Sequence, residues 1–159
     1  MNLTTPVQIE NRPGSPLKIP EGGRILILCD DKRDAERLRE IVQMEGFLCE
    51  WAKSITSGCE AAKSGQFQVV VSTPLLVDGS WRRLADLANH YDLRFEIVLW
   101  TRNFDFRDWA AALEEGAFDV LDAQCERPKA LEATKTALWA AYLKGAGPNP
   151  SPSSPRKAA

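Results

Sequence analysis

Few residues in this chain have types and spacing that could do chemistry. An acidic pair, Asp30 and Asp31, stands directly after the apolar run 25–29, and carboxylate oxygens are hard ligands that suit Mg²⁺. The chain has four cysteines without a CxxC pair and one histidine, His90, so the usual zinc ligand sets cannot be assembled. A Ser-His-Asp or Cys-His site would have to use His90 as its base. We expect the cysteines to be reduced and mostly buried.

The composition is that of one ordinary soluble domain. Of 159 residues, 44% are hydrophobic and 26% charged, and 20 Lys and Arg stand against 22 Asp and Glu, a net charge of -2. Such a charge gives no general field for nucleic acid or an anionic membrane. No apolar run approaches the roughly 18 to 20 residues of a membrane span, and the first residues have neither a basic start nor an apolar h-region. We expect a cytoplasmic protein that binds neither nucleic acid nor membrane.

The ends of the chain differ in composition from its middle. Residues 1–22 contain four prolines and no apolar periodicity, and residues 145–159 are rich in Pro and Ser. Such segments bury too little surface to offset the entropy of ordering. The sequence predicts a disordered N-terminal arm, a folded domain over residues 23–144, and a disordered tail.

Within the folded domain, apolar runs of strand length alternate with segments of helical period. Asp34 is expected to cap the first helix, Ser54 or Thr56 the second and Ser80 the third, and Pro128 opens the last. The predicted strands are residues 25–29, 47–52, 67–72, 95–100 and 117–121. This (βα)5 alternation predicts an α/β fold, a doubly wound open parallel five-stranded sheet of flavodoxin-like topology. Ligands of such sheets bind beyond the carboxyl ends of the strands.

Four stretches, ILILCDD, FQVVVSTPLLVDGSW, IVLWTR and ALEEGAFDVL, resemble the receiver domain of bacterial two-component response regulators. The resemblance covers about residues 24–144. It implies the strand order 2-1-3-4-5 and a place in phosphorelay signal transduction.

The resemblance also implies which positions would form a phosphorylation pocket. In the family, an acidic pair holds Mg²⁺, an aspartate after the third strand accepts the phosphoryl group, a Thr or Ser ends the fourth strand, and a lysine follows the fifth. Here Asp30 and Asp31 match the acidic pair and Thr101 matches the hydroxyl. The acceptor position falls on Thr73, and the lysine position on Ala123. The resemblance therefore implies a degenerate receiver, with no cofactor or at most weak Mg²⁺ binding at the acidic pair.

Four further residues bear on this pocket. The aromatic residue that moves with the strand-four hydroxyl in the family falls on Val120, which has no ring. Lys32 or Arg102 could fold over the acidic pair as a built-in cation in place of Mg²⁺. Asp78 could be mistaken for an acceptor, but with Gly79 it fits an ordinary turn.

The leading hypothesis is a stand-alone receiver-like module, not an enzyme, that binds a protein partner such as a histidine kinase without phosphorylation. Its contact surface would include Phe104, Phe106 and Trp109, because aromatic side chains in an exposed loop are costly in water unless covered. The resemblance adds a possible homodimer through the fourth helix, fifth strand and fifth helix.

Two alternatives have the same fold. One is a true Mg²⁺-dependent phosphoacceptor that uses Asp30, Asp31 or Asp78. The other is a nucleotide- or flavin-binding protein. It would need a Gly- or Ser/Thr-rich loop after the first strand, where this chain has carboxylates that would repel a phosphate.

Overall fold

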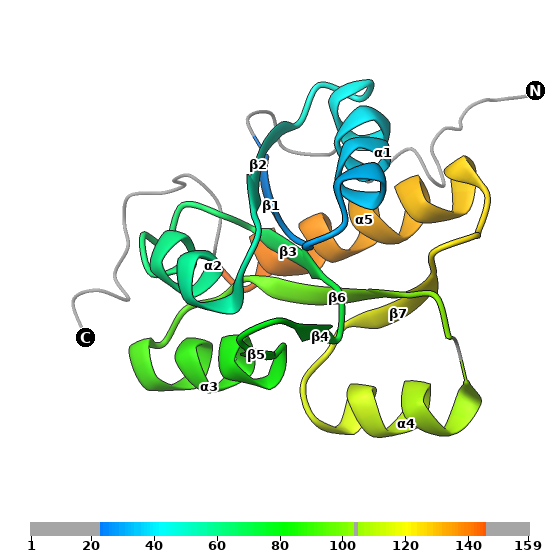
Figure 1. Ribbon diagram of the computed structural model, residues 1–159. Coiled ribbons are helices and arrows are strands. Elements are labelled where there is room, and N and C mark those ends of the chain that lie inside the picture. The colour runs from blue at the N-terminus through cyan, green and yellow to red at the C-terminus, as the bar shows by residue number, and fades with distance from the viewer. Residues whose placement is uncertain (1–22, 104, 146–159) are drawn as a thin grey trace, which may run out of the picture.

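The computed structural model describes residues 23–103 and 105–145. The predicted arm, most of the predicted tail and Phe104 lie outside these residues. Five parallel strands form one sheet in the order β2-β1-β3-β6-β7, which confirms the predicted fold class (Figure 1). The strands are β1 (Arg24–Leu28), β2 (Leu48–Ala52), β3 (Val69–Ser72), β6 (Glu96–Thr101) and β7 (Asp119–Asp122).

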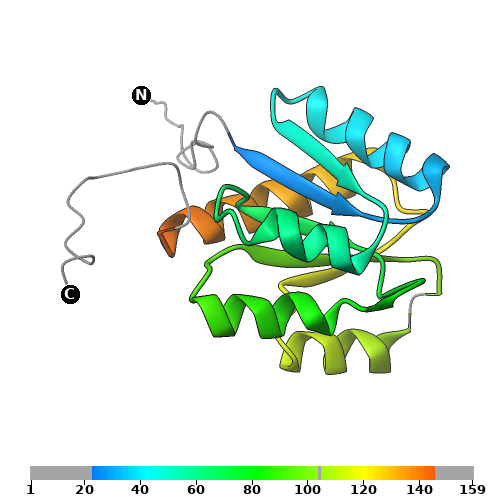
Figure 2. The same ribbon diagram turned by 60° about the vertical axis from the view of Figure 1, so that its left-hand side comes forward.

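Five helices cover the two faces of the sheet. They are α1 (Lys32–Gln43), α2 (Ile55–Ala62), α3 (Arg82–Tyr91), α4 (Phe106–Glu114) and α5 (Arg127–Leu143). Helices α1 and α5 lie on one face and α2, α3 and α4 on the other (Figures 1 and 2). In the described part of the chain, no helix is both long enough and apolar enough to cross a membrane.

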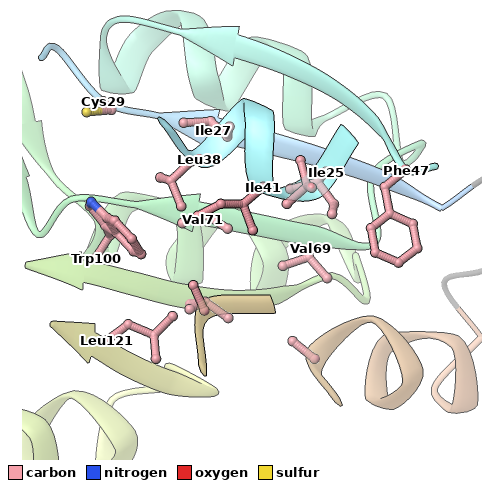
Figure 3. Close-up of a cluster of buried hydrophobic side chains, with 14 of the residues drawn as sticks. Ile25, Ile27, Cys29, Leu38, Ile41, Phe47, Val69, Val71, Trp100 and Leu121 are labelled. Carbon is pink, nitrogen blue, oxygen red and sulfur yellow. The ribbon is translucent and has the colours of Figure 1, made fainter. Parts of the chain in front are cut away.

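The side chains of the sheet alternate between two hydrophobic clusters. In β1 and the residue after it, Ile25, Ile27 and Cys29 face α1 and α5, and Leu26 and Leu28 face α2 and α3. Both sets are almost fully buried, as expected for a parallel strand that is covered on two faces. Figure 3 shows the α1/α5 cluster, where the β1 side chains pack against apolar residues of α1, β3, β6 and β7.

The structure corrects several predicted boundaries. Asp31, not Asp34, caps α1: its carboxylate accepts hydrogen bonds from the amides of Arg33 and Asp34. Ser80 accepts the amide of Arg82, the first residue of α3, through its Oγ at 3.1 Å, although the N-cap position itself is Trp81, whose side chain makes no cap bond. Ser80 also belongs to a short antiparallel hairpin that the sequence did not predict. The hairpin consists of β4 (Leu75–Leu76) and β5 (Gly79–Ser80). Helix α4 begins at Phe106, and Asp105 is its cap.

All four cysteines are free. Cys29 and Cys59 are buried, and Cys49 and Cys125 are partly exposed. Burial raises the pKa of the Cys29 and Cys49 thiols to about 11. These two thiols are therefore protonated at neutral pH and poor nucleophiles.

Candidate functional site

The predicted pocket residues gather at the carboxyl edge of the sheet, where the parallel strands β1, β3, β6 and β7 end (Figures 1 and 2). Main-chain hydrogen bonds join these ends. The amide of Thr73 donates to the carbonyl of Leu28 over 3.1 Å, and the amide of Ala123 donates to the carbonyl of Thr101 over 2.8 Å. The fold therefore brings the backbone of the predicted positions together, and their side chains decide what the edge can do.

The two carboxylates of the acidic pair after β1 have different surroundings. Asp31 Oδ1 accepts hydrogen bonds from the amides of Arg33, at 2.9 Å, and Asp34, at 3.2 Å, and thereby begins α1. Asp30 is exposed. One oxygen of Asp31 is thus committed to the helix, and its second oxygen, Oδ2, is left for another partner.

A cation from the neighbouring strand lies against that second oxygen. Arg102 follows β6, and its Nη2 atom lies 3.6 Å from Asp31 Oδ2 and 2.9 Å from Asp34 Oδ1. Asp34 is only 9% exposed, and a carboxylate this far from water needs a partner of opposite charge. Arg102 therefore ties the start of α1 to the end of β6.

Of the two predicted cations, the structure places Arg102 over the acidic residues and Lys32 elsewhere. The side chain of Lys32 is 76% exposed, and its ammonium lies 4.0 Å from Glu36, one turn along the same helix. An exposed pair of this kind contributes little to stability. The alternative that Lys32 is the built-in cation is thus corrected. The reason is that the Lys32 ammonium pairs with Glu36 on the surface of α1, whereas Arg102 reaches the acidic residues from the end of β6.

This arrangement fits Mg²⁺ poorly. A magnesium ion needs closely placed oxygen ligands in near-octahedral geometry, whereas Asp31 already has one oxygen on backbone amides and the other beside a guanidinium. Within residues 23–103 and 105–145, no three His, Cys, Asp or Glu side chains come together as metal ligands would. A metal ion at this edge would have to compete with Arg102.

The positions that correspond to the phosphoacceptor and the lysine carry neutral side chains. The Thr73 hydroxyl donates to the carbonyl of Leu75 at 3.3 Å, and the Ala123 methyl group is 4% exposed. The Thr101 hydroxyl accepts a hydrogen bond from the amide of Asn103 at 3.1 Å, so it closes the turn after β6. None of the three side chains supplies the charge that phosphoryl transfer needs.

Sequence reasoning missed Arg37, which stabilises the loop after β7. Its guanidinium donates to the carbonyl of Ala123 at 2.5 Å and to that of Cys125 at 2.7 Å, and it stacks on the Trp100 ring, 5.5 Å from the centroid. Arg37 stands three residues after Asp34, so both lie on one face of α1. That spacing was the one signal available in the sequence, and it does not predict hydrogen bonds to carbonyl groups 86 and 88 residues further along the chain.

Asp78 lies in the turn between β4 and β5, as the sequence predicted for a turn residue. Its carboxylate accepts hydrogen bonds from the amides of Ile55, at 2.8 Å, and Thr56, at 2.9 Å. These bonds, with that of the Thr56 amide foremost, hold the pKa of Asp78 at about 2, below its ordinary 3.8. The hairpin thus anchors the N-terminus of α2 through an ionised aspartate, and both oxygens of that aspartate have partners.

The predicted partner face is described only in part. Phe106 is 75% exposed at the start of α4, and its ring meets the Trp109 ring edge to face, with centroids 6.1 Å apart. Trp109 packs partly into the core, and its Nε1 lies 3.4 Å from Asp119 Oδ1. The structure therefore shows one exposed and one half-buried aromatic side chain on this face.

Solved structures that resemble this chain include response regulator receiver domains. No protein-family model and no curated protein matches the sequence. A CheY-like receiver domain protein from Methanospirillum hungatei is 21% identical with a TM-score of 0.69, and 79% of this chain covers all of that one. A receiver domain protein from Clostridium thermocellum is 18% identical with a TM-score of 0.67, over 77% of this chain and 98% of the other. The beryllofluoride-activated NtrC4 receiver domain dimer is 21% identical with a TM-score of 0.67, over 72% and 95%. The chain therefore has the fold of a response regulator receiver domain.

Proposed function

We propose that this protein is a cytoplasmic receiver-like signalling module of two-component signal transduction that acts by binding a protein partner and is not phosphorylated on an aspartate of its own. One observation carries the proposal. Arg102 pairs with Asp31 and Asp34 at the carboxyl edge of the sheet, while the position after β3 is Thr73. The edge that would bind Mg²⁺ and phosphate in the family thus has its own cation and no carboxylate acceptor.

The chemistry of phosphoryl transfer supports this reading. The acceptor must be an ionised carboxylate, and cations must neutralise the charge that spreads over the transferring group. Thr73 is neutral, Ala123 has no ammonium group, and Arg102 is paired with acidic residues of α1. We therefore expect neither catalysis nor a resident cofactor, and we expect the domain to signal through its surface.

The partner is expected to bind over Phe106 and Trp109 at the start of α4. An exposed aromatic side chain can anchor an interface, because it buries a large apolar area at little cost in conformational entropy. A histidine kinase, another signalling protein or a second copy of this chain would each fit such a face. The beryllofluoride-activated NtrC4 receiver domain is a dimer. A second copy of this chain is therefore the first partner to test.

The test compares three versions of the purified chain: the wild type, Phe106→Ala, and Tyr91→Ala as the matched control. Tyr91 is an exposed aromatic at the end of α3, 51% accessible. Self-association, measured by sedimentation, and the capture of a partner from the source cells should both be weakened by Phe106→Ala and unaffected by Tyr91→Ala. Beryllofluoride with Mg²⁺ should change neither result. A partner that binds only with beryllofluoride, or binds all three versions equally, would contradict the proposal.

A further inference from the structure

A small pocket lies between the end of β6, the start of α4 and the beginning of α3. Its volume is about 160 Å³. Trp81, Leu99 and Val120 give it an apolar lining, and each of these side chains is buried. Polar groups of Asn103 and Asp108 also line it. The pocket thus combines an apolar lining with polar groups, as sites for small molecules do.

The volume limits what this pocket can hold. An apolar cavity of about 150 Å³ accommodates one benzene ring, whereas sites for drug-sized ligands measure about 300 to 1,000 Å³. The pocket under α4 is therefore large enough for one ring with a short substituent, and too small for a nucleotide or a flavin.

The charges around the pocket favour a cation. Arg82 is the basic residue of its lining, and its guanidinium is paired with Glu115, with Nε 2.6 Å from Oε1. Asp105 uses one oxygen to accept the amide of Arg107. Asp108 has no hydrogen bond or ion pair with any other described residue. The carboxylates of Asp105 and Asp108 give the pocket an excess of negative charge. The partial positive charge at the N-terminus of α4 offsets only part of this excess, so the pocket is acidic.

We propose that this pocket binds a small planar organic cation, with its ring against Trp81, Leu99 and Val120 and its amidinium, guanidinium or ammonium group facing Asp108. Burial of the ring against the apolar lining favours binding because apolar surface leaves water. Attraction between the cation and the unpaired carboxylate of Asp108 favours binding as well. The ligand would lie beside Thr101, at the end of the strand that precedes Arg102. The proposal does not depend on whether the domain is phosphorylated.

Benzamidine is a suitable probe, because it is one ring with one amidinium group. Titration into the ¹⁵N-labelled full chain should shift the backbone amide signals of Thr101, Asn103 and Asp108 in a saturable way. Benzyl alcohol, which has the ring but no charge, should bind several-fold more weakly, and benzoate should not bind. Equal binding of benzoate, or saturable shifts confined to other parts of the chain, would overturn the proposal.

Three variants locate the site. Asp108→Asn should weaken benzamidine binding by up to about fivefold, because the loss of one exposed charge pair has at most an effect of this size. Glu114→Gln, which removes an exposed carboxylate of the same helix outside the pocket, should leave the affinity unchanged. Ala111→Trp, at an exposed position of the lining, should abolish binding while the remaining amide signals stay dispersed. Equal affinity in Asp108→Asn and the wild type, or full binding by Ala111→Trp, would refute the assignment. Binding of acetyl-arginine amide, which has a guanidinium group and no ring, without binding of benzamidine would refute the role given to the ring.

Discussion

Arg102 Nη2 lies 2.9 Å from Oδ1 of Asp34, a carboxylate that is 9% exposed. The two residues are 68 positions apart in the chain, and their contact joins the end of β6 to the first turn of α1. Because the same Arg102 nitrogen also lies 3.6 Å from Asp31 Oδ2, one guanidinium serves both acidic side chains. This cation is part of the fold and needs no ligand to supply it.

Replacement of Arg102 by alanine should destabilise the domain. Asp34 would lose its cation while it remains largely out of water, and we expect a loss of about 1 kcal/mol in the free energy of unfolding, since the guanidinium is itself half exposed. Urea denaturation measures this change. Lys32→Ala is the control, with an expected change below about 0.5 kcal/mol. Equal effects of the two substitutions would mean that Arg102 is not the stabilising cation.

The Arg102→Ala variant should also respond to Mg²⁺ when the wild type does not. Without the guanidinium, the oxygens of Asp31 and Asp34 that it contacts would have no cation beside them, and a divalent ion that binds only the folded state stabilises it. Thermal melts with increasing MgCl₂, against NaCl of equal ionic strength, should raise the Tm of the variant alone. A Mg²⁺-dependent rise in the wild type would contradict our account of this edge.

Arg37→Ala should lower the stability of the domain more than most substitutions on α1. It removes two hydrogen bonds from a charged donor to the carbonyls of Ala123 and Cys125, and a contact with Trp100. We expect a loss of about 2 kcal/mol, measured by denaturation. Arg33→Ala is the matched control, an exposed arginine on the same helix, and should change stability by less than about 0.5 kcal/mol. A similar loss in both variants would argue for a general effect of charge.

Asp78→Asn should lower the Tm at neutral pH, because the ionised carboxylate accepts the amides of Ile55 and Thr56 at the start of α2. The pKa of Asp78 falls from 3.8 to about 2 on folding, so its contribution is fully present above about pH 4 and is lost as the pH falls through about 2. The difference in Tm between wild type and variant should therefore shrink between these values. Asp86→Asn, which removes a carboxylate of α3 without a described partner, should show no such pH dependence. A constant difference for Asp78→Asn would mean that its charge is not what anchors α2.

The sheet could be predicted from the sequence because each parallel strand is a distinct apolar run, and each helix between them ends near a glycine or begins near a capping residue. The cap of α1 was misassigned to Asp34 because Asp31 and Asp34 are equally good capping types three residues apart. The β4–β5 hairpin was missed because strands of two residues carry no periodicity.

The candidate site was predictable in position but only partly in its contacts. The carboxyl ends of parallel strands always meet, so Asp30, Asp31, Thr73, Thr101 and Ala123 could be assigned to one edge. Which cation lies there depends on side-chain direction, which separates Arg102 from Lys32 and has no sequence signal. The role of Arg37 depends on carbonyl groups far along the chain, and a main-chain acceptor leaves no trace in the sequence.

The central claim is that the domain is not phosphorylated on an aspartate of its own, and intact-protein mass spectrometry tests it most directly. The full chain is incubated with acetyl phosphate and Mg²⁺, with an active receiver domain as positive control. Our account predicts no change in mass for this chain while the control gains one phosphoryl group. A gain of one phosphoryl group that depends on Mg²⁺ and is lost in Asp30→Asn, Asp31→Asn or Asp78→Asn would contradict it.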